Sequence, residues 1–303
     1  MHLFQAPVVR ELAEFTRLPD KFRRKEVPTW ALANRGGALT ESFLEGPVFD
    51  GDGNLYVTDI PYGRIFRIDA SGAWTLVAEY DGEPNGMKWM GGELLVTDYK
   101  NGLVAVDPAT GKARDYLRRR NTESFKGVND LVFDSKGNVY FTDQGQTGLH
   151  DPTGRVYRLA PGGRLDMLLA NCPSPNGVVL SADEKVLFVA MTRGNCVWRM
   201  PLLPDGSVTK AGQFFTSYGP SGPDGLAMDE AGRLVVCNPG LGVAWVVNAH
   251  GEPVEVLRAA PGTSLTNVAY GGPGNRTAFF TDSTEGRILK AEMQAAGCPV
   301  NRS

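Results

Sequence analysis

The chain has 303 residues, of which 42% are hydrophobic and 21% are charged, and its formal net charge is −3. This balance is ordinary for a globular protein and lacks the positive charge of a nucleic-acid-binding surface. No stretch approaches the roughly 18 apolar residues of a membrane-spanning helix, and the opening MHLFQAPVVRELAEF does not resemble a secretion signal. We therefore expect a cytoplasmic protein that binds neither membranes nor nucleic acid.

Cysteine and histidine are sparse and scattered. The four cysteines, Cys172, Cys196, Cys237 and Cys298, form no C-x-x-C pair, which favours reduced thiols over a zinc site or a disulfide framework. The three histidines lie far apart, at positions 2, 150 and 250. Any metal site in this chain would therefore use oxygen ligands.

The first 40 residues precede a series of repeats and do not share their pattern. Within them, AEFTRLP (13–19) is a candidate extended segment, whereas VVRELAEF (8–15) also fits a helical arm. The sequence leaves both interpretations open for this extension.

Six similar segments follow, each with an apolar run, a turn and a second apolar run, as in a β-hairpin. They are EGPVFDGDGNLYVTD from 45, PNGMKWMGGELLVTD from 84, VNDLVFDSKGNVYFTD from 128, PNGVVLSADEKVLFVA from 175, PDGLAMDEAGRLVVCN from 223 and TNVAYGGPGNRTAFFTD from 266. One polar residue near the start of each segment serves as its marker residue. The marker residues recur every 40 to 48 residues and are Glu45, Asn85, Asn129, Asn176, Asp224 and Asn267.

Two further strands are predicted after each hairpin, such as GRIFRID (63–69) and WTLVAEY (74–80). Four short strands in every 40–48 residues, with almost no helical periodicity, are typical of a β-propeller. We predict an all-β, six-bladed β-propeller of four-stranded blades, forming a single domain over residues 1–303 with the blades starting at about residue 41. The last repeat lacks a fourth strand, so we expect the segment at 13–19 to supply it and close the ring.

The marker residues should meet at one mouth of the central channel, because the first strand of each propeller blade lines that channel. Two marker residues are carboxylates and four are amides, and all offer the oxygen ligands that hard divalent cations prefer. An ion there would offset the cost of burying Glu45 at the start of a strand. Asn-Gly and Asp-Gly pairs are also common turn formers, and Asn85 and Asn267 fit that structural role.

A second polar set ends the second strand of each hairpin, where antiparallel pairing brings it beside the marker residues. Its members are Asp59, Asp98, Asp143, Thr192, Asn238 and Asp282. These side chains either face the channel mouth or cap backbone N–H groups of neighbouring segments.

The repeats resemble the family of senescence marker protein, the gluconolactonases and luciferin-regenerating enzyme, and more distantly diisopropyl fluorophosphatase, all of them six-bladed propellers. The resemblance covers nearly the whole chain from about residue 40. It rests on EGPVF, VNDLVFDSKGNVYFTD, SPNGVVLS and GPDGLAMD.

This resemblance implies that Glu45, Asn176 and Asp224 hold one divalent metal ion at the channel mouth. Asn129 corresponds to a position that joins the metal ligands or contacts substrate, and Asp143 to a substrate-contacting position. Calcium is the expected ion, and magnesium, manganese or zinc also suits such a site.

We expect a metal-dependent hydrolase that opens a small, sugar-derived lactone, with the lactone as its small-molecule partner. A divalent ion polarises a carbonyl and lowers the pKa of a bound water. Asp224 would take the proton from the attacking water or hold that water in place, and Asn129 would orient the substrate.

Two alternatives remain. The same metal centre could serve hydrolysis of organophosphate esters or fluorides. A non-catalytic propeller that binds a ligand or protein would instead use the ion for structure alone, and it would present a broad exposed face rather than a small polar pocket.

Overall fold

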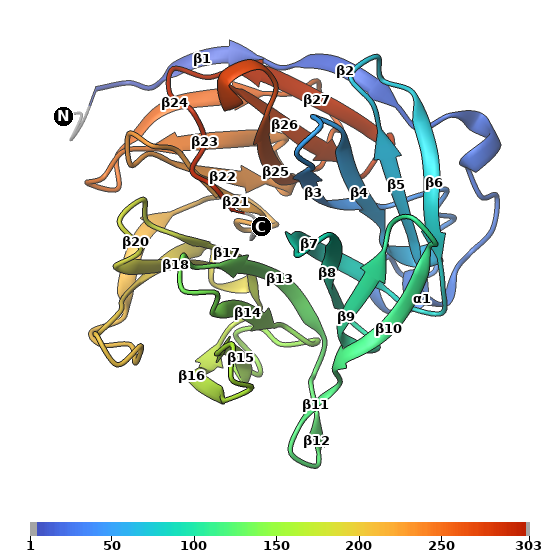
Figure 1. Ribbon diagram of the computed structural model, residues 1–303. Helices are drawn as coiled ribbons and strands as arrows, with labels where there is room; N and C mark the ends of the chain where they lie inside the picture. Colours follow the sequence, from blue (N-terminus) through green and yellow to red (C-terminus); the bar gives the residue numbers. More distant parts are fainter. Residues whose placement is uncertain (1–4, 301–303) are drawn as a thin grey trace.

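The computed structural model describes residues 5–300 and consists almost entirely of β-strands. Its strands form six blades around a central channel, as predicted (Figure 1). The strands nearest the channel are β3, β7, β13, β17, β21 and β25, the first strands of the successive blades.

The first three blades each contain four antiparallel strands that follow one another in the chain. Blade one comprises β3 (Leu44–Phe49), β4 (Leu55–Asp59), β5 (Arg64–Ile68) and β6 (Trp74–Glu79). Blade two comprises β7 (Pro84–Met90), β8 (Glu93–Asp98), β9 (Gly102–Asp107) and β10 (Lys112–Leu117). Blade three comprises β13 (Val128–Phe133), β14 (Val139–Asp143), β15 (Gly154–Leu159) and β16 (Leu165–Cys172). A small hairpin of β11 (Arg119–Arg120) and β12 (Glu123–Ser124) precedes blade three.

The last three blades repeat this order, with additions from the N-terminal segment. Blade four comprises β17 (Pro175–Leu180), β18 (Val186–Met191), β19 (Cys196–Pro201) and β20 (Gly212–Thr216). Blade five comprises β21 (Leu226–Met228), β22 (Leu234–Asn238), β23 (Val243–Val247) and β24 (Pro253–Arg258). Blade six comprises β25 (Leu265–Gly271), β26 (Thr277–Asp282) and β27 (Arg287–Glu292) from the end of the chain.

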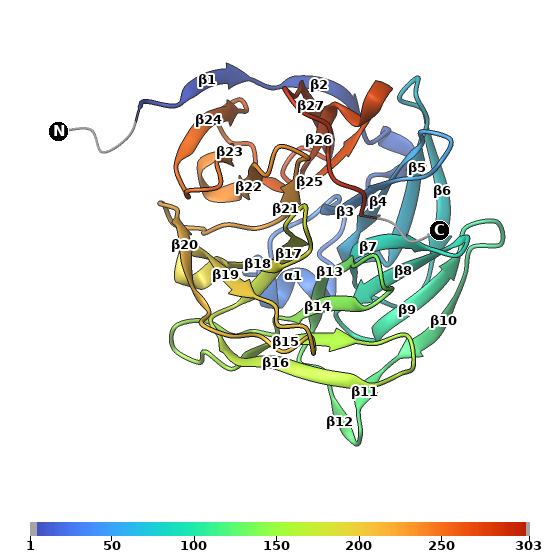
Figure 2. The same ribbon diagram turned by 60° about the vertical axis from the view of Figure 1, so that its left-hand side comes forward.

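The N-terminal segment closes the ring. β2 (Ala13–Arg17) pairs antiparallel with β27 and becomes the fourth strand of blade six, which confirms the strand predicted at 13–19. β1 (Val8–Glu11) lies parallel to β24 on the outer edge of blade five, so the helical alternative for residues 8–15 is wrong. The segment therefore joins two neighbouring blades along their outer edges (Figures 1 and 2).

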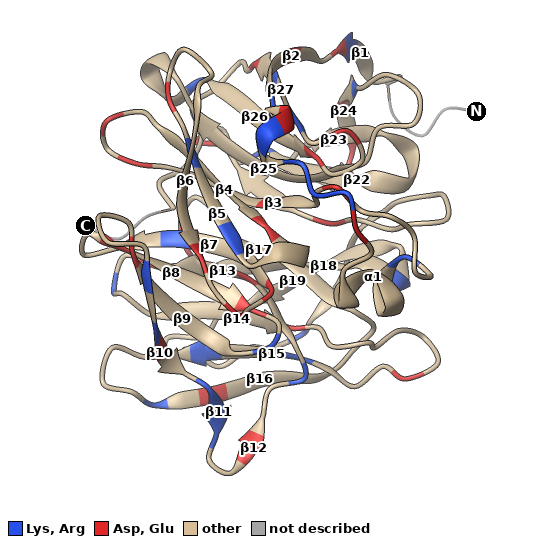
Figure 3. Ribbon diagram, turned by 90° about the vertical axis from the view of Figure 1, so that its right-hand side faces the viewer, with Lys and Arg blue, Asp and Glu red and all other residues tan. Residues whose placement is uncertain are grey.

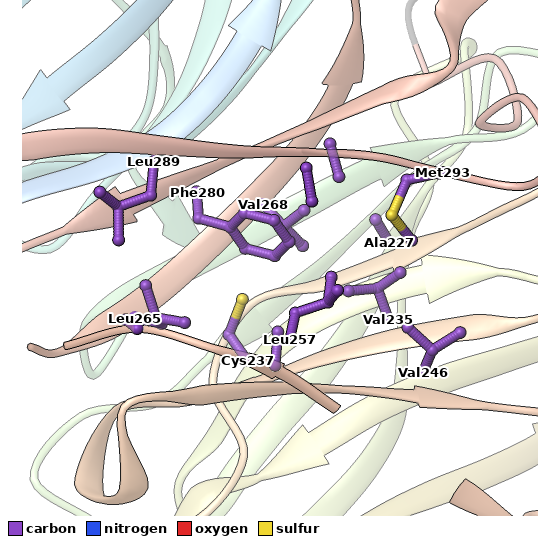
Figure 4. Packing of buried hydrophobic residues seen from close by; sticks show 14 residues of the cluster. Ala227, Val235, Cys237, Val246, Leu257, Leu265, Val268, Phe280, Leu289 and Met293 are labelled. Carbon is purple, nitrogen blue, oxygen red and sulfur yellow. The ribbon is translucent and has the colours of Figure 1, made fainter. Parts of the chain in front are cut away.

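Apolar side chains between the blades form the core. Figure 4 shows one such cluster, in which Phe280 and Val268 of blade six lie against Cys237 and Leu257 of blade five. All four are at least 95% buried. Burial of this kind contributes about 1.5–3 kcal/mol for each large apolar side chain, so adhesion between blades is a main source of stability.

One short α-helix stands apart from the blades. α1 (Thr29–Asn34) follows the closing strand, and its Trp30 ring packs on Phe43 with a centroid distance of 4.8 Å. Seen from the side, α1 lies on one face of the propeller (Figure 3). No helix within residues 5–300 combines the length and apolar character needed to cross a membrane.

Candidate metal and substrate site

A local irregularity accompanies the marker residue in five of the six inner strands. The pairing register with the second strand shifts at the start of β3, β7, β13, β17 and β25, between Glu45 and Val48 in the first blade for example. Such bulges turn a side chain out of the regular sheet alternation. They allow the marker residues to face the channel mouth.

Glycine after a marker residue lets neighbouring blades approach closely. A Cβ atom on Gly177 would lie 2.8 Å from the Cα of Gly225, and one on Gly86 would lie 2.8 Å from the Cα of Asp130. Gly46 faces the Asn85 carbonyl in the same way and also has a φ of +52°, which favours glycine. The glycines of these Asn-Gly, Asp-Gly and Glu-Gly pairs are therefore required by packing between blades.

Threonines near the ends of the second strands hold neighbouring blades together. The Thr58 hydroxyl donates to the Asn85 carbonyl at 2.8 Å, and the Thr142 hydroxyl donates to the Asn176 carbonyl at 2.7 Å. Thr97 donates to the Asn129 carbonyl in the same manner. Each of these bonds fixes the backbone of the marker residue in the following blade.

A cavity of about 340 Å³ occupies the mouth of the channel on the α1 side. Five of the six marker residues line it, namely Glu45, Asn85, Asn129, Asn176 and Asp224. The sixth, Asn267, donates from Nδ2 to Glu45 Oε2 at 2.7 Å. The structure thus brings together side chains that lie more than 200 residues apart in the chain, as the repeat predicted.

Burial disfavours the charged forms of the Glu45 and Asp224 carboxylates. Burial raises the pKa of Glu45 to about 7, even though Gly46 N and Asn267 Nδ2 donate to it. The pKa of Asp224 is raised well above its usual value, first by burial and then by repulsion from Glu45 and Asp130. Asp224 retains contact with the cavity while protein surrounds it on its other sides. Two negative charges held near one another in this way suit a divalent cation.

The other marker residues at the cavity, Asn85, Asn129 and Asn176, offer amide oxygens as possible metal ligands. Within residues 5–300 no cluster of three or more His, Cys, Asp or Glu side chains is arranged to hold a metal. A metal ion here would accordingly rely on the two carboxylates together with asparagine side chains. Asn85 Oδ1 is buried in the cavity wall and has no hydrogen-bond partner, as expected of a group next to a ligand site. The residues present fit an oxygen-ligated divalent ion.

Asn129 is held in one orientation by a chain of hydrogen bonds. Its Nδ2 donates to Gln144 Oε1 at 2.9 Å, and Gln144 Nε2 donates to Ser174 Oγ at 2.9 Å. Because Asn129 Nδ2 is bound to Gln144, the side-chain oxygen Oδ1 of Asn129 is the atom that can face a ligand in the cavity.

Asp143 does not line this cavity, contrary to the expectation that it contacts substrate. Its side chain is fully buried, accepts a hydrogen bond from Gly127 N at 2.9 Å and lies 3.9 Å from the Arg155 guanidinium. Asp59 likewise accepts from Phe43 N at 2.7 Å. The register explains the difference, because Asp143 lies opposite Val128, the residue before the marker residue.

The remaining members of the second polar set are also engaged with their own surroundings. Asp98 accepts from Glu83 N, Asp282 accepts from Ser264 N, and Thr192 donates to the Pro223 carbonyl. Asn238 donates to the Tyr218 carbonyl. The four aspartates therefore have the capping role that was the structural alternative, whereas Thr192 and Asn238 bind backbone carbonyls.

Several cavity residues come from segments outside the repeat. Trp30, Asn34 and Arg35 belong to α1 and the residue after it, and Arg193 belongs to the loop after β18. Asn34 is tied to the facing loop, because Gln146 Nε2 donates to Asn34 Oδ1 at 3.2 Å. Nothing in the sequence pattern placed α1 over the channel mouth, since its position depends on how the N-terminal segment crosses the outer edge of the propeller.

A family model described as the SMP-30/gluconolactonase/LRE-like region matches residues 43–284. The chain belongs to this family. The match begins immediately before blade one and ends after β26, and so leaves out the N-terminal segment that carries β1, β2 and α1.

Family members with assigned names include two bacterial lactonases. Lactonase drp35 of Staphylococcus haemolyticus is 34% identical over 224 residues, which cover 70% of this chain and 68% of that protein. The gluconolactonase of Zymomonas mobilis is 31% identical over 272 residues, covering 79% of this chain and 76% of that protein.

Solved structures of other proteins share the fold at lower identity. A calcium-binding regucalcin from Agrobacterium tumefaciens superposes with a TM-score of 0.75 at 21% identity, covering 98% of this chain and all of the other. A gluconolactonase from Xanthomonas campestris gives a TM-score of 0.73 at 20% identity, covering 93% and 97%. At these identities the likeness concerns the six-bladed fold.

Proposed function

We propose that this protein is a divalent-metal-dependent hydrolase that opens a small, sugar-derived lactone. The named relatives that hydrolyse lactones, at more than 30% identity over most of both chains, support the reaction class. The observation that carries the metal-dependent part is the cavity in which Glu45, Asn176 and Asp224 meet, with two buried carboxylates that repel one another.

Glu45, Asn176 and Asp224 would hold the ion, for which calcium suits the all-oxygen donor set and magnesium, manganese or zinc are alternatives. When bound, such an ion polarises a lactone carbonyl and lowers the pKa of a water molecule. Asn129, whose amide nitrogen is fixed by Gln144, presents its carbonyl oxygen to a substrate hydroxyl.

Asp224 would assist the attacking water. Its carboxylate faces the cavity and is well placed to accept a proton from a water positioned against the substrate carbonyl. Addition of that water to the carbonyl carbon, followed by cleavage of the ring C–O bond, yields the open hydroxy acid. The cavity of about 340 Å³ suits a single sugar-sized ring.

The experiment is acid release from a panel of sugar lactones by protein stripped of metal and then supplied with Ca²⁺, Mg²⁺, Mn²⁺ or Zn²⁺. We expect no turnover without metal, and a loss of about 10²–10⁴-fold in Asp224→Ala, the usual contribution of a positioned acid–base group. Asp69→Asn, at an exposed turn far from the cavity, is the matched control. Full turnover by metal-free protein or by Asp224→Ala would refute the proposal.

The panel should also include a phosphotriester. Preference for that ester over every lactone would replace the proposed reaction while keeping the metal centre. If the protein binds metal but hydrolyses none of these compounds, the non-catalytic propeller that binds a ligand or protein becomes the favoured alternative.

A further inference from the structure

Two arginine side chains line the cavity, and no hydrogen bond or ion pair within residues 5–300 holds either of them. Arg193 and Arg35 both line the cavity at the channel mouth and are exposed to it. Within residues 5–300 neither guanidinium takes part in an ion pair or a hydrogen bond, whereas Arg64, Arg155 and Arg158 each bind a carboxylate. An arginine left unpaired in a cavity wall is available to a ligand.

The backbone of Arg193 is fixed beside the candidate metal site. Arg193 lies in a single 3-10 turn, Thr192–Gly194, whose Thr192 hydroxyl donates to the Pro223 carbonyl at 2.8 Å. Pro223 immediately precedes Asp224, and the Arg193 guanidinium is close enough to act on the Asp224 carboxylate. A group bound to Arg193 would therefore be within one small molecule's length of the proposed reaction centre.

Arg193 also marks the junction with a second cavity. That cavity has a volume of about 460 Å³ and is lined by the loop from Gln144 to His150, with Asn34, Ser174 and Arg193. Asn34, Gln144 and Arg193 line both cavities, so the two are continuous along one wall. Together the two cavities are longer than one sugar ring requires, and Arg193 lies where they join.

The balance of charge favours an anion at this junction. Among the described residues that line either cavity, Glu45 and Asp224 are the acidic ones, and a divalent ion would offset both. Arg193 and Arg35 would then remain as uncompensated positive charges. A guanidinium binds a carboxylate or a phosphate through two parallel hydrogen bonds, which neutral hydroxyl groups do not match.

We propose that Arg193, assisted by Arg35, forms a subsite for an anionic group on the substrate, so that the lactone acted on carries a carboxylate or a phosphate on its tail. This inference rests on the proposed lactone hydrolysis, and it names the substrate class of that site. Arg193 is a binding residue for specificity, while the reaction centre remains at Glu45, Asn176 and Asp224.

The test compares three lactones with the same ring: a neutral hexonolactone, its analogue with a carboxylate at C6 and its 6-phosphate. We expect kcat/KM to be at least about 10-fold higher for one or both anionic lactones, with the preference weakening as salt is added. In Arg193→Gln the ratio of anionic to neutral kcat/KM should fall about 10- to 100-fold, the range for a lost charge-assisted pair. Arg193→Lys should restore part of it.

Arg199→Gln is the matched control, because Arg199 is exposed on β19 and lines neither cavity, and the ratio should match that of the unmodified protein. The relative rates of the carboxylate and phosphate analogues identify which anion the subsite takes. Equal kcat/KM for neutral and anionic lactones, or an equal loss for both in Arg193→Gln, would overturn the proposal.

Failure of the proposed reaction can be told apart from failure of the subsite. If no lactone is hydrolysed, the metal-loaded protein is titrated calorimetrically with a six-carbon sugar diacid and with its monoacid analogue. Tighter binding of the diacid that is lost in Arg193→Gln supports the subsite without lactone hydrolysis. Equal binding of the two acids contradicts it.

Discussion

Close contact between the inner strands of blades four and five makes Gly177→Ala a sharp test of the candidate site. Gly177 follows Asn176, and its missing side chain faces the backbone of the segment that carries Asp224. A Cβ atom would lie 2.3 Å from the Asp224 carbonyl oxygen and 2.8 Å from the Cα of Gly225. The substitution therefore forces apart two of the proposed metal ligands without altering either.

The size of the effect follows from these distances. Atoms of this kind do not approach within about 3 Å, so the two strands have to separate by roughly 0.7 Å. Overpacking of this degree costs about 1–3 kcal/mol of stability. Metal–ligand distances tolerate a change of only about 0.2 Å, and a misplacement of about 1 Å can lower a rate by about 10²-fold. We therefore expect a moderate loss of stability and a much larger loss of metal affinity and turnover.

Three measurements on purified protein check this reasoning: thermal unfolding, calorimetric titration with Ca²⁺ and lactone hydrolysis. Gly162→Ala is the matched control, because a Cβ atom there meets nothing within 4 Å and the backbone is not left-handed. If Gly177→Ala folds, binds metal as tightly as the control and retains its turnover, then Asn176 and Asp224 do not share an ion.

Three further changes test how the fold holds the site. Replacing Arg64 by Met leaves Asp59 buried without its cation, so urea unfolding should show a loss of about 3–5 kcal/mol, against less than about 1 kcal/mol for Arg17→Met at an exposed pair. Arg158 and Arg164 lower the pKa of Asp166, so the ionised carboxylate stabilises the folded protein above the ordinary aspartate pKa of 3.8, and this stabilisation is lost as the pH falls. Asp166→Asn should therefore be less stable than the unmodified protein at pH 7 and equally stable in acid. Deleting residues 1–17 exposes the edge of β27, and light scattering should then detect association that the full chain does not show.

The repeat made the fold and the meeting of the marker residues predictable. Six copies of a four-strand pattern at regular spacing, with no helix within the repeats, are typical of blades that pack side by side around an axis, so equivalent positions are expected to form a ring. The missing strand of the last repeat likewise predicted β2, because an unpaired edge at the point of closure would be costly. None of this required knowledge of any individual contact.

The parts that escaped prediction depend on geometry that the repeat does not encode. Asp143 seemed to adjoin the marker residues, but its register partner is Val128, so its carboxylate caps Gly127 N. α1 could not be assigned to the cavity because its segment occurs once in the chain and has no equivalent to compare. Arg193 lies in a 3-10 turn that also follows the second strand in blades one and five, but its equivalents there, Pro61 and Gly240, carry no charge that would indicate a binding site. Substrate recognition by such segments is accordingly the least predictable property of a propeller.

Charged residues in the channel occupy positions where most other blades have an uncharged residue. The threonine hydroxyls of blades one to three, and the glycines that follow four of the marker residues, contact the backbone of the next blade in nearly the same way each time. Asp130 instead occupies the position after a marker residue where four other blades have glycine, and its carboxylate lies 3.9 Å from Lys88 Nζ inside the channel. Two carboxylates among six marker residues match the charge of the one divalent ion that we propose, and inter-blade packing alone does not explain why Glu45 and Asp224 replace asparagine.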